Sequence, residues 1–340
     1  MKLSERIEHA WYGHYNRLWP LAPIEALYTA IVRRRRARFL STPPPPASVP
    51  VIVVGNLSVG GTGKSPLVAW LADFLREEGW QPGIVSRGYG GKADHYPLRV
   101  LPNSDPTVVG DEPVMLAQQT GAAVSVSPQR PEAIAQLVEE GCTIIISDDG
   151  LQHYAMARDI ELVVVDGARG FGNRHCLPCG PLREPMTRLA SVDAVIGNGA
   201  EKIVDGAFDM HLTPLCLRNL VTGEQRAFND QAVKQPVHAV AGIGHPARFF
   251  NTLSSLSIAH YAHPFTDHHQ FSAQDLAFDD DALIIMTAKD AVKCQAFATS
   301  RCWALDVQAA PSAAFMLFLK QRLNALPCRP TNASTPHERN

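Results

Sequence analysis

Residues 51–65 read VIVVGNLSVGGTGKS and carry the strongest structural signal in the chain. Four apolar, β-branched residues predict a buried strand, and the glycines after them predict a tight turn into a helix. Gly63, Lys64 and Ser65 match the end of the phosphate-binding pattern G-x-x-x-x-G-K-[ST], whereas Ser58 stands in place of its first glycine. Strand, glycine-rich turn and helix in this order predict a P-loop that binds ATP.

The side chains and backbone of this loop have expected roles in holding Mg·ATP. Its glycines let backbone amides approach phosphate oxygens, and the following helix directs its N-terminal amides at the same anion. Lys64 would contact the β- and γ-phosphates, and the Ser65 hydroxyl would bind Mg²⁺. The expected ATP-binding residues are Ser58, Val59, Gly60, Gly61, Thr62, Gly63, Lys64 and Ser65.

Short apolar runs alternate with helical patterns after residue 51. The runs predicted to form strands are 51–54, 83–85, 122–126, 143–146, 162–165 and 194–196. Residues 65–78 and 130–140 have the pattern of helices. Continuous Val/Ile runs separated by helices indicate a P-loop NTPase-like α/β fold, with a doubly wound, mostly parallel sheet covered on both faces.

A second acidic group for Mg²⁺ is expected at the end of another strand. Asp148 and Asp149 directly follow the predicted strand 143–147, at the edge where open α/β sheets bind ligands. One carboxylate can bind the metal directly and the other through water, so Ser65, Asp148 and Asp149 form the predicted metal site. The alternative is a turn with aspartates at their usual positions.

A weaker α/β pattern continues beyond residue 210 and predicts a second, smaller α/β domain. Its expected strands are 237–243, 283–286 and 303–307, and its expected helices are 251–256 and 313–323. The predicted organisation is an N-terminal segment (1–42), a P-loop core (43–210), the smaller domain (211–328) and a polar tail (329–340).

The N-terminal segment has the composition of a helix that lies in a membrane interface. Residues 19–32 are mostly apolar, with Glu25 as their one charge, and five arginines follow within residues 33–38. Such a helix would place its arginines against the anionic lipids of a cytoplasmic leaflet. The alternative is a helix packed on the domain with an exposed basic end. We expect neither a transmembrane helix nor a cleavable signal peptide, because no apolar run is long enough.

The overall composition excludes several classes of protein. The chain has 340 residues and a net charge of −2, so it lacks the basic field of a nucleic-acid binder. No obligate protein partner is evident. Its seven cysteines, an odd number, indicate a reducing cytoplasm rather than a disulfide framework. Cys176 and Cys179 form a lone CxxC, which we interpret as ordinary loop cysteines.

Seven blocks of sequence together resemble the tetraacyldisaccharide 4′-kinases of lipid A synthesis. They are residues 58–66, 86–90, 110–113, 148–153, 180–184, 242–244 and 265–269. The resemblance implies transfer of the γ-phosphate of ATP to the 4′-hydroxyl of a tetraacyldisaccharide 1-phosphate, which gives the 1,4′-bisphosphate precursor lipid IVA. It also implies a location on the cytoplasmic face of the inner membrane, as a peripheral or monotopic protein. Ser65 and Ala288 depart from the family pattern, which usually has Thr and Glu there.

Catalytic roles follow partly from position and partly from this resemblance. Asp111 stands at a predicted loop–helix junction and is our expected proton acceptor, with a helix-capping role as the alternative. The resemblance pairs it with His268, although neighbouring His269 is an open alternative. Lys64 completes the predicted catalytic set by neutralising phosphate charge.

Further polar residues are expected near the phosphates or the acceptor. Arg183 can bind phosphate oxygens bidentately, and a surface ion pair is its alternative. Glu184, Gln152 and His153 are expected around the metal and phosphates. Arg87 and Tyr89, on a glycine-bounded loop, are placed for nucleotide or acceptor contact.

Two rival functions are weaker. A P-loop GTPase or metal-insertion chaperone needs an [NT]-K-x-D block, and residues 287–290 read TAKD, in the wrong order. A non-enzymatic membrane adaptor would have no use for the blocks at 110–112 and 267–268. We therefore expect an ATP-dependent lipid kinase.

Overall fold

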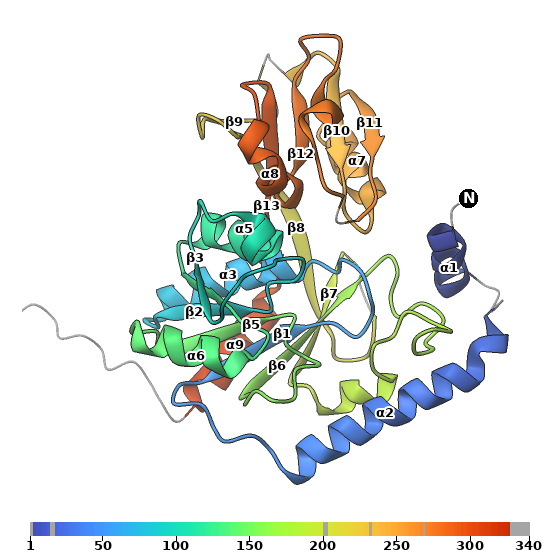
Figure 1. Ribbon diagram of the computed structural model, residues 1–340, viewed down its shortest axis with the longest axis vertical. Coiled ribbons are helices and arrows are strands. Elements are labelled where there is room, and N and C mark those ends of the chain that lie inside the picture. Colours follow the sequence, from blue (N-terminus) through green and yellow to red (C-terminus); the bar gives the residue numbers. More distant parts are fainter. Residues whose placement is uncertain (1–2, 14–17, 200–202, 231–232, 268, 327–340) are drawn as a thin grey trace, which may run out of the picture.

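The computed structural model describes residues 3–13, 18–199, 203–230, 233–267 and 269–326. Within these ranges the strands form one thirteen-stranded sheet in the order β11-β10-β12-β13-β8-β7-β6-β1-β5-β2-β4-β3, with β9 paired to β8. The sheet spans a larger lobe and a smaller lobe, and the two longest strands connect them (Figure 1). This arrangement confirms the predicted α/β fold with a mostly parallel sheet.

The larger lobe contains the strands and helices predicted around the P-loop. Its strands are β1 (Val51–Gly55), β2 (Pro82–Ser86), β3 (Leu98–Val100), β4 (Ala123–Val126), β5 (Ile144–Asp148), β6 (Ile160–Asp166) and β7 (Ala194–Asn198). Its helices are α3 (Lys64–Glu77), α4 (Pro106–Val109), α5 (Asp111–Thr120), α6 (Arg130–Glu139) and α9 (Ala313–Asn324). The short strand β3 was not predicted and pairs antiparallel to β4 at the sheet edge.

Both faces of the central strand are buried, which explains its continuous apolar sequence. Ile52 and Val54 pack in one hydrophobic cluster with α3, α5 and α9, whereas Val51 and Val53 pack in another with α6. β1 pairs in parallel with both β5 and β6, so their carboxyl ends meet at one edge of the sheet. The P-loop and Asp148 therefore emerge side by side.

The smaller lobe is a second α/β unit, and its strands continue the same sheet. It contains β9 (Gln225–Arg226), β10 (Val237–Ala241), β11 (His260–Pro264), β12 (Ile284–Thr287), α7 (Pro246–Ser255) and α8 (Ala288–Cys294). Strands β10, β11 and β12 pair in parallel, with β12 also parallel to β13. The remaining short helices are η1 (Trp19–Leu21), η2 (Met186–Ser191), η4 (Ala273–Leu276) and η5 (Gln295–Phe297).

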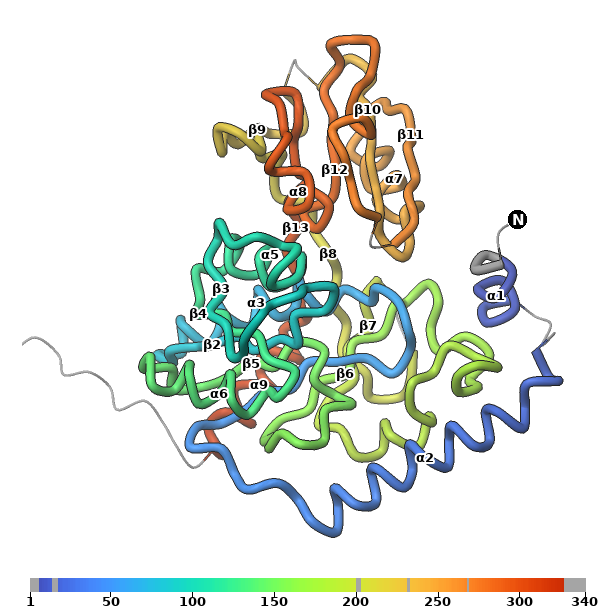
Figure 2. Tube along the Cα trace, in the orientation of Figure 1, coloured from blue at the N-terminus to red at the C-terminus, as the bar shows by residue number. Residues whose placement is uncertain are grey.

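Two long strands connect the lobes. β8 (Phe208–Asn219) leaves the larger lobe and β13 (Cys302–Pro311) returns to it, and the two pair antiparallel. β8 therefore runs through the expected domain boundary at residue 210. The expected helix at 313–323 is α9, and its Phe315 and Leu319 pack in the larger lobe's core rather than in the smaller lobe (Figure 2).

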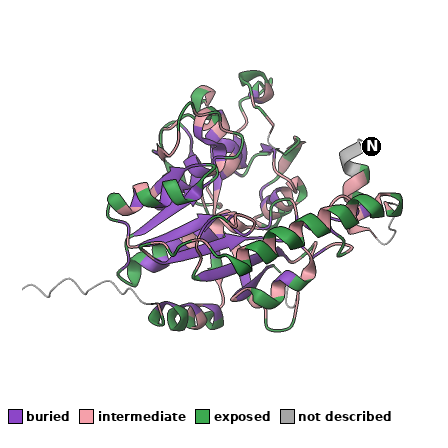
Figure 3. Cartoon of the chain, turned by 60° about the horizontal axis from the view of Figure 1, so that its bottom comes forward, coloured by how far each residue is buried: buried purple, intermediate pink, exposed green. Residues whose placement is uncertain are grey.

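The N-terminal helices lie outside the sheet layers. α1 (Leu3–Tyr12) and the 20-residue α2 (Ala22–Ser41) flank the larger lobe, and α2 has no fully buried residue. Its outward side is exposed along most of its length (Figure 3). Among the described residues, no helix combines the length and the apolar character needed to cross a bilayer.

Candidate functional site

The P-loop has the backbone that its glycines predict. Gly60 and Gly63 have φ angles of 100° and 92°, a region that residues with side chains rarely adopt. A Cβ on Gly63 would lie 2.3 Å from Asn198 Nδ2, which donates to the Thr62 carbonyl at 3.0 Å. Asn198, at the end of β7, was not predicted, and it supports the loop from behind.

Asp148 and Asp149 follow each other in sequence but occupy opposite environments. Asp148 is buried, and neither of its carboxylate oxygens has a hydrogen-bond partner among the described residues. Burial, with Glu112 and Asp149 nearby, raises the pKa of Asp148 to about 7. Burial opposes ionisation of Asp149 as well, but Lys64 and Arg183 outweigh it and lower its pKa to about 2. Among the described residues Asp148 thus forms no ion pair or hydrogen bond through its carboxylate, whereas Asp149 pairs with two cations.

Arg130 shapes this acidic turn, and sequence reasoning missed it. Its buried guanidinium donates to the Asp148 carbonyl at 2.7 Å and to the Asp149 carbonyl at 3.0 Å. These bonds stabilise the φ angle of 48° at Asp149, which is uncommon for a residue other than glycine. An arginine at a helix start gave no local signal of this role, because the contact joins α6 to the end of β5.

Arg183 connects the acidic turn to the P-loop, through an ion pair and hydrogen bonds. Its Nη1 donates to Asp149 Oδ2 at 2.9 Å, and its Nη2 donates to Asn56 Oδ1 at 2.6 Å. Its Nε donates to the Ser58 carbonyl at 3.3 Å. Lys64 Nζ lies 3.6 Å from Asp149 Oδ1, so two cations converge on one carboxylate beside the loop.

Glu184 and Gln152 form the layer behind Arg183. Glu184 is buried and accepts hydrogen bonds from Gln152 Nε2, at 3.1 Å, and from the Tyr154 hydroxyl. Gln152 Oε1 accepts from Arg183 Nη1 at 3.2 Å. Gln152 therefore holds Arg183 from behind, and Glu184 holds Gln152.

His153 lies half-buried in the same turn. Its Nε2 is buried without a hydrogen-bond partner among the described residues. Burial, together with Arg130 and Arg158, lowers the pKa of His153 to about 4. His153 is therefore a neutral imidazole in the folded protein at neutral pH.

Asp111 starts α5 and faces cations that come from the smaller lobe. It is buried, and its Oδ2 lies 3.9 Å from Lys289 Nζ and 3.8 Å from Lys293 Nζ, both on α8. Lys289 also donates to Glu112 Oε1 at 2.9 Å. Burial opposes the charge on Lys289, but Glu112 and Asp111 outweigh it and raise its pKa. This contact between the lobes was not predicted.

The loop that carries Arg87 and Tyr89 lies against the Asp111 loop. A Cβ on Gly110 would lie 2.8 Å from the Tyr89 carbonyl, which leaves room there only for glycine. The side chains of Arg87 and Tyr89 are exposed beside this contact. They can therefore reach a molecule bound next to Asp111.

The smaller lobe also meets the P-loop directly. A Cβ on Gly244 would lie 3.5 Å from the Gly61 backbone nitrogen. His268 lies outside the described residues. His269 is held inside its own lobe, where its Nε2 lies 3.4 Å from Asp275 Oδ2 and its ring packs against Phe265. A loop of the smaller lobe thus packs directly on the P-loop.

The inner side of α2 is bonded to the loop that precedes Arg183. The Tyr28 hydroxyl donates to the Arg183 carbonyl at 2.9 Å, and Glu25 Oε1 accepts from the Cys176 amide at 2.8 Å. Burial raises the pKa of the Cys176 thiol, and burial with Glu25 raises that of Cys179 to about 11. Neither thiol is activated, in agreement with their interpretation as loop cysteines.

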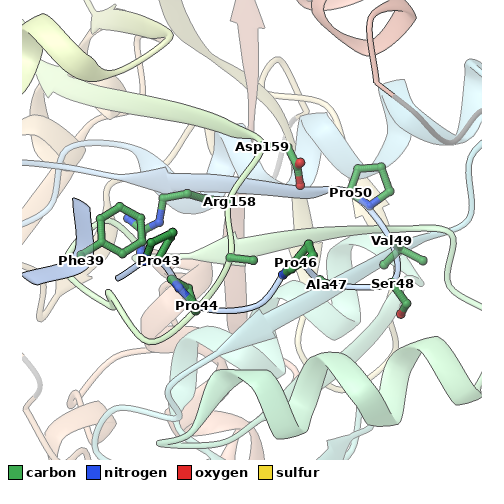
Figure 4. A pocket seen from close by; sticks show the side chains of 11 residues that line it. Phe39, Pro43, Pro44, Pro46, Ala47, Ser48, Val49, Pro50, Arg158 and Asp159 are labelled. Atoms are coloured by element: carbon green, nitrogen blue, oxygen red, sulfur yellow. The ribbon is translucent and has the colours of Figure 1, made fainter. Parts of the chain in front are cut away.

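A cavity of about 280 Å³ lies far from these residues, at the opposite end of β1 (Figure 4). Prolines 43, 44, 46 and 50 line it together with Phe39 and Arg158. Pro50 precedes β1, whereas the P-loop follows β1, so the length of the strand separates them. We assign this cavity no part in the chemistry.

Comparisons with known proteins agree with the geometry. Residues 17–324 match the family described as tetraacyldisaccharide-1-P 4′-kinase. The tetraacyldisaccharide 4′-kinase of Pseudomonas paraeruginosa is 48% identical over 332 residues, covering 97% of this chain and 100% of that protein. The one from Pseudomonas fluorescens is 50% identical over 333 residues, covering 96% and 98%.

The fold has a solved counterpart as well. The crystal structure of LpxK from Aquifex aeolicus, in complex with ATP, superposes with a TM-score of 0.76 and 27% identity. It covers 89% of this chain and 98% of that one. These matches confirm the resemblance seen in the seven sequence blocks. The chain belongs to the tetraacyldisaccharide-1-phosphate 4′-kinase family.

Proposed function

We propose that this chain transfers the γ-phosphoryl group of ATP to the 4′-hydroxyl of a tetraacyldisaccharide 1-phosphate, forming the 1,4′-bisphosphate lipid A precursor. The observation that carries the proposal is the meeting of three groups at one sheet edge. These are the glycine-rich P-loop with Lys64, the buried carboxylate of Asp148, whose oxygens have no hydrogen-bond partner among the described residues, and the Arg183–Asp149 pair. Phosphoryl transfer needs in-line placement and charge neutralisation, and these groups supply both.

Asp148 and Ser65 fit a magnesium ion. A buried carboxylate whose two oxygens have no hydrogen-bond partner among the described residues is costly unless a cation binds it. Mg²⁺ prefers oxygen ligands and commonly binds one or two carboxylates besides phosphates and water. When bound, it would neutralise charge on the β- and γ-phosphates. Asp149 already pairs with Lys64 and Arg183, so it would act on the metal through a water molecule.

Asp111 accepts the proton of the attacking hydroxyl in this proposal. It is buried at the start of α5, beside the exposed Arg87 and Tyr89 that would hold the acceptor. Lys289 and Lys293 lie within 4 Å of its carboxylate, so cations of the smaller lobe face it. His268 is the proposed partner that orients it, by resemblance to the family.

The outer side of α2 is proposed to lie on an anionic membrane on the cytoplasmic side. Trp19, Ile24, Leu27 and Ile31 are 73%, 56%, 63% and 51% exposed. Four of the five arginines that follow are exposed, whereas Arg36 points inward and donates to Ser191. Each exposed arginine near anionic lipid would contribute about 1 kcal/mol. Because Tyr28 bonds to the Arg183 carbonyl, a membrane-bound α2 would also hold the Arg183 loop close to the bilayer.

The direct test is one incubation of purified protein with radiolabelled ATP, Mg²⁺ and the tetraacyldisaccharide 1-phosphate. A labelled 1,4′-bisphosphate is expected. Lys64→Ala should lower turnover by more than about 100-fold because phosphate charge is no longer neutralised. Asp111→Ala should lower it about 100-fold or more while nucleotide binding persists. Full turnover by Asp111→Ala would remove the assignment of the proton acceptor.

A further inference from the structure

Arg169 lies in the loop after β6 and contacts three separate parts of the molecule. Its Nη2 donates to Glu8 on α1 and to the Gly244 carbonyl of the smaller lobe, the latter at 3.1 Å. A Cβ on Gly60 of the P-loop would lie 3.3 Å from Arg169 Nη1. The guanidinium therefore lies where α1, the smaller lobe and the P-loop meet, and the roles assigned above do not use it.

The guanidinium is largely shielded from solvent, and α1 provides much of its surroundings. The Arg169 side chain is 15% exposed, and its Cζ lies 5.0 Å from the centre of the Tyr12 ring. Glu8 supplies the carboxylate of its ion pair. Charge-assisted hydrogen bonds and cation–π contacts are stronger where water is excluded. Arg169 therefore depends on α1 for an anion and for an aromatic neighbour.

Helix α1 is fixed to the same loop by bonds that do not involve the guanidinium. The Trp11 carbonyl accepts from the Asn173 amide at 2.8 Å, and Trp11 Nε1 donates to the Pro178 carbonyl at 3.0 Å. A Cβ on Gly172 would lie 2.7 Å from the Trp11 carbonyl, so a side chain there would prevent this approach. Removal of the Glu8 carboxylate should therefore leave α1 in place and change only the bonding of the guanidinium.

The bond to Gly244 lies at the point where the smaller lobe touches the P-loop. A Cβ on Gly244 would lie 3.5 Å from the Gly61 backbone nitrogen. Backbone amides of a P-loop must converge on phosphate oxygens in order to bind them. A side chain that bonds to Gly244 and packs on Gly60 therefore fixes the backbone on both sides of this contact.

We propose that Arg169 is a positioning residue through which α1 holds the P-loop and the smaller lobe in the arrangement that binds Mg·ATP. Glu8 and Tyr12 hold the guanidinium, and the guanidinium holds the Gly244 loop against the P-loop. Preorganisation of this kind strengthens binding without a new contact to the ligand. This role rests on the proposed function in taking Mg·ATP as the ligand, and it gives α1 a part in nucleotide binding that is separate from any contact with lipid.

The test is a double-mutant cycle, measured by calorimetric binding of Mg·ATP to the full chain. Arg169→Met should weaken binding about tenfold, which corresponds to one lost hydrogen bond to a charged group. Glu8→Ala should weaken it about threefold, because Glu8 acts only through the guanidinium. In the Arg169→Met background, Glu8→Ala should cause no further loss, whereas independent effects would multiply. Arg322→Met, which removes an ion pair between α9 and Asp193, is the control and should bind like the wild type.

Two further measurements separate positioning from a general loss of structure. Glu8 is 47% exposed, so Glu8→Ala opens no core, and its KM for a detergent-dispersed acceptor should be unchanged. Arg169→Lys keeps a cation between Glu8 and the Gly244 carbonyl, so it should bind Mg·ATP more tightly than Arg169→Met.

Three results would overturn the role of Arg169. They are effects that multiply in the double variant, wild-type affinity for Mg·ATP in Arg169→Met, and a defect of Glu8→Ala confined to the KM for the acceptor. If the unaltered protein forms no bisphosphate while Mg·ATP binding still follows the cycle, the proposed kinase function is wrong and the role of Arg169 stands.

Discussion

Adjacent aspartates illustrate how strongly surroundings control a side chain. Asp148 and Asp149 share one turn, yet burial raises the pKa of the first to about 7, while Lys64 and Arg183, against opposing burial, lower that of the second to about 2. Asp148 therefore destabilises the fold when ionised, and this cost is accepted where a cation is to bind. A substitution of Asp148 should therefore lower activity while raising the stability of the metal-free protein.

Asp148→Asn should abolish turnover and stabilise the metal-free protein. Folding raises the pKa of Asp148, so its ionised carboxylate destabilises the folded state above about pH 7, whereas the protonated form at pH 5 does not. The gain in unfolding free energy from Asp148→Asn should therefore be larger at pH 8 than at pH 5. About 1 kcal/mol is expected at pH 8. Urea unfolding in the presence of a chelator measures it. Asp149→Asn is the matched control and should destabilise, because Lys64 and Arg183 lose their anion; a destabilised Asp148→Asn would contradict this account.

His153 should make stability sensitive to mild acid. Burial, with Arg130 and Arg158, lowers its pKa to about 4, against 6.5 in the unfolded chain. Its contribution to stability is therefore complete above pH 6.5 and is lost as pH falls from 6.5 towards 4. Unfolding free energies of His153→Gln should fall less steeply over this range than those of the wild type. His211→Gln, at an exposed position, serves as control, and equal slopes for all three proteins would refute the prediction.

The two sides of helix α2 differ in chemistry and in contacts. Its inward residues recur at helical spacing and contact the body, as Glu25, Tyr28 and Arg36 do through hydrogen bonds. Its outward residues are apolar in the first half of the helix and mostly basic in the second half. A helix of a soluble domain normally exposes its polar side, so this outward apolar side favours a membrane surface over the alternative of simple packing.

Leu27→Glu and Ile31→Glu together should reduce flotation with vesicles of anionic phospholipid by at least tenfold. Both side chains are more than half exposed, so the substitutions remove apolar contact with lipid without opening the core. Stability and activity on detergent-dispersed acceptor should be nearly unchanged. Tyr28→Phe, on the inward side, is the matched control and should float like the wild type. Unimpaired flotation of the double variant would exclude α2 as the membrane contact.

Helix α8 gives the smaller lobe a direct effect on the proposed chemistry. Lys289 links Glu112, Asp111 and Asp267 across the lobes. Lys289→Met should lower kcat about tenfold with little change in KM for ATP, because the cation lies beside Asp111, the proposed proton acceptor, and not in the P-loop. Steady-state kinetics with saturating acceptor measures both constants. Lys320→Met, which removes a surface pair with Glu78, is the control, and an unchanged kcat for Lys289→Met would refute the role.

The two lobes share one sheet, and β8 and β13 are the strands that connect them, so the conformation of these two strands determines how the lobes lie relative to each other. These strands pair antiparallel over most of their length, with a register shift between Asp306 and Val307. The P-loop, the acidic turn and Asp111 belong to the larger lobe, whereas Lys289 reaches Asp111 and Gly244 reaches the P-loop from the smaller one. Nucleotide and acceptor would therefore bind where the lobes meet, as expected for an enzyme that closes on its substrates.

The P-loop, the acidic turn and the central strands were readable from sequence, because each depends on residues close together in the chain. Continuous Val/Ile runs marked β1, β5 and β6, and the glycine spacing marked the loop. Strands β8 and β11 escaped notice because they are partly exposed and carry polar residues, which break the apolar pattern. The same reason hides any edge or connecting strand that is not buried on both faces.

Contacts between distant segments could not be read in this way. Arg130 holding the acidic turn, Asn198 behind Gly63 and Lys289 beside Asp111 each join elements that sequence spacing leaves unrelated. The location of α9 in the larger lobe likewise depends on the return path of β13. Local sequence pattern thus predicted the phosphate-binding loop. Only the tertiary structure decided which side chains surround that loop, because these come from distant segments that the shared sheet brings together.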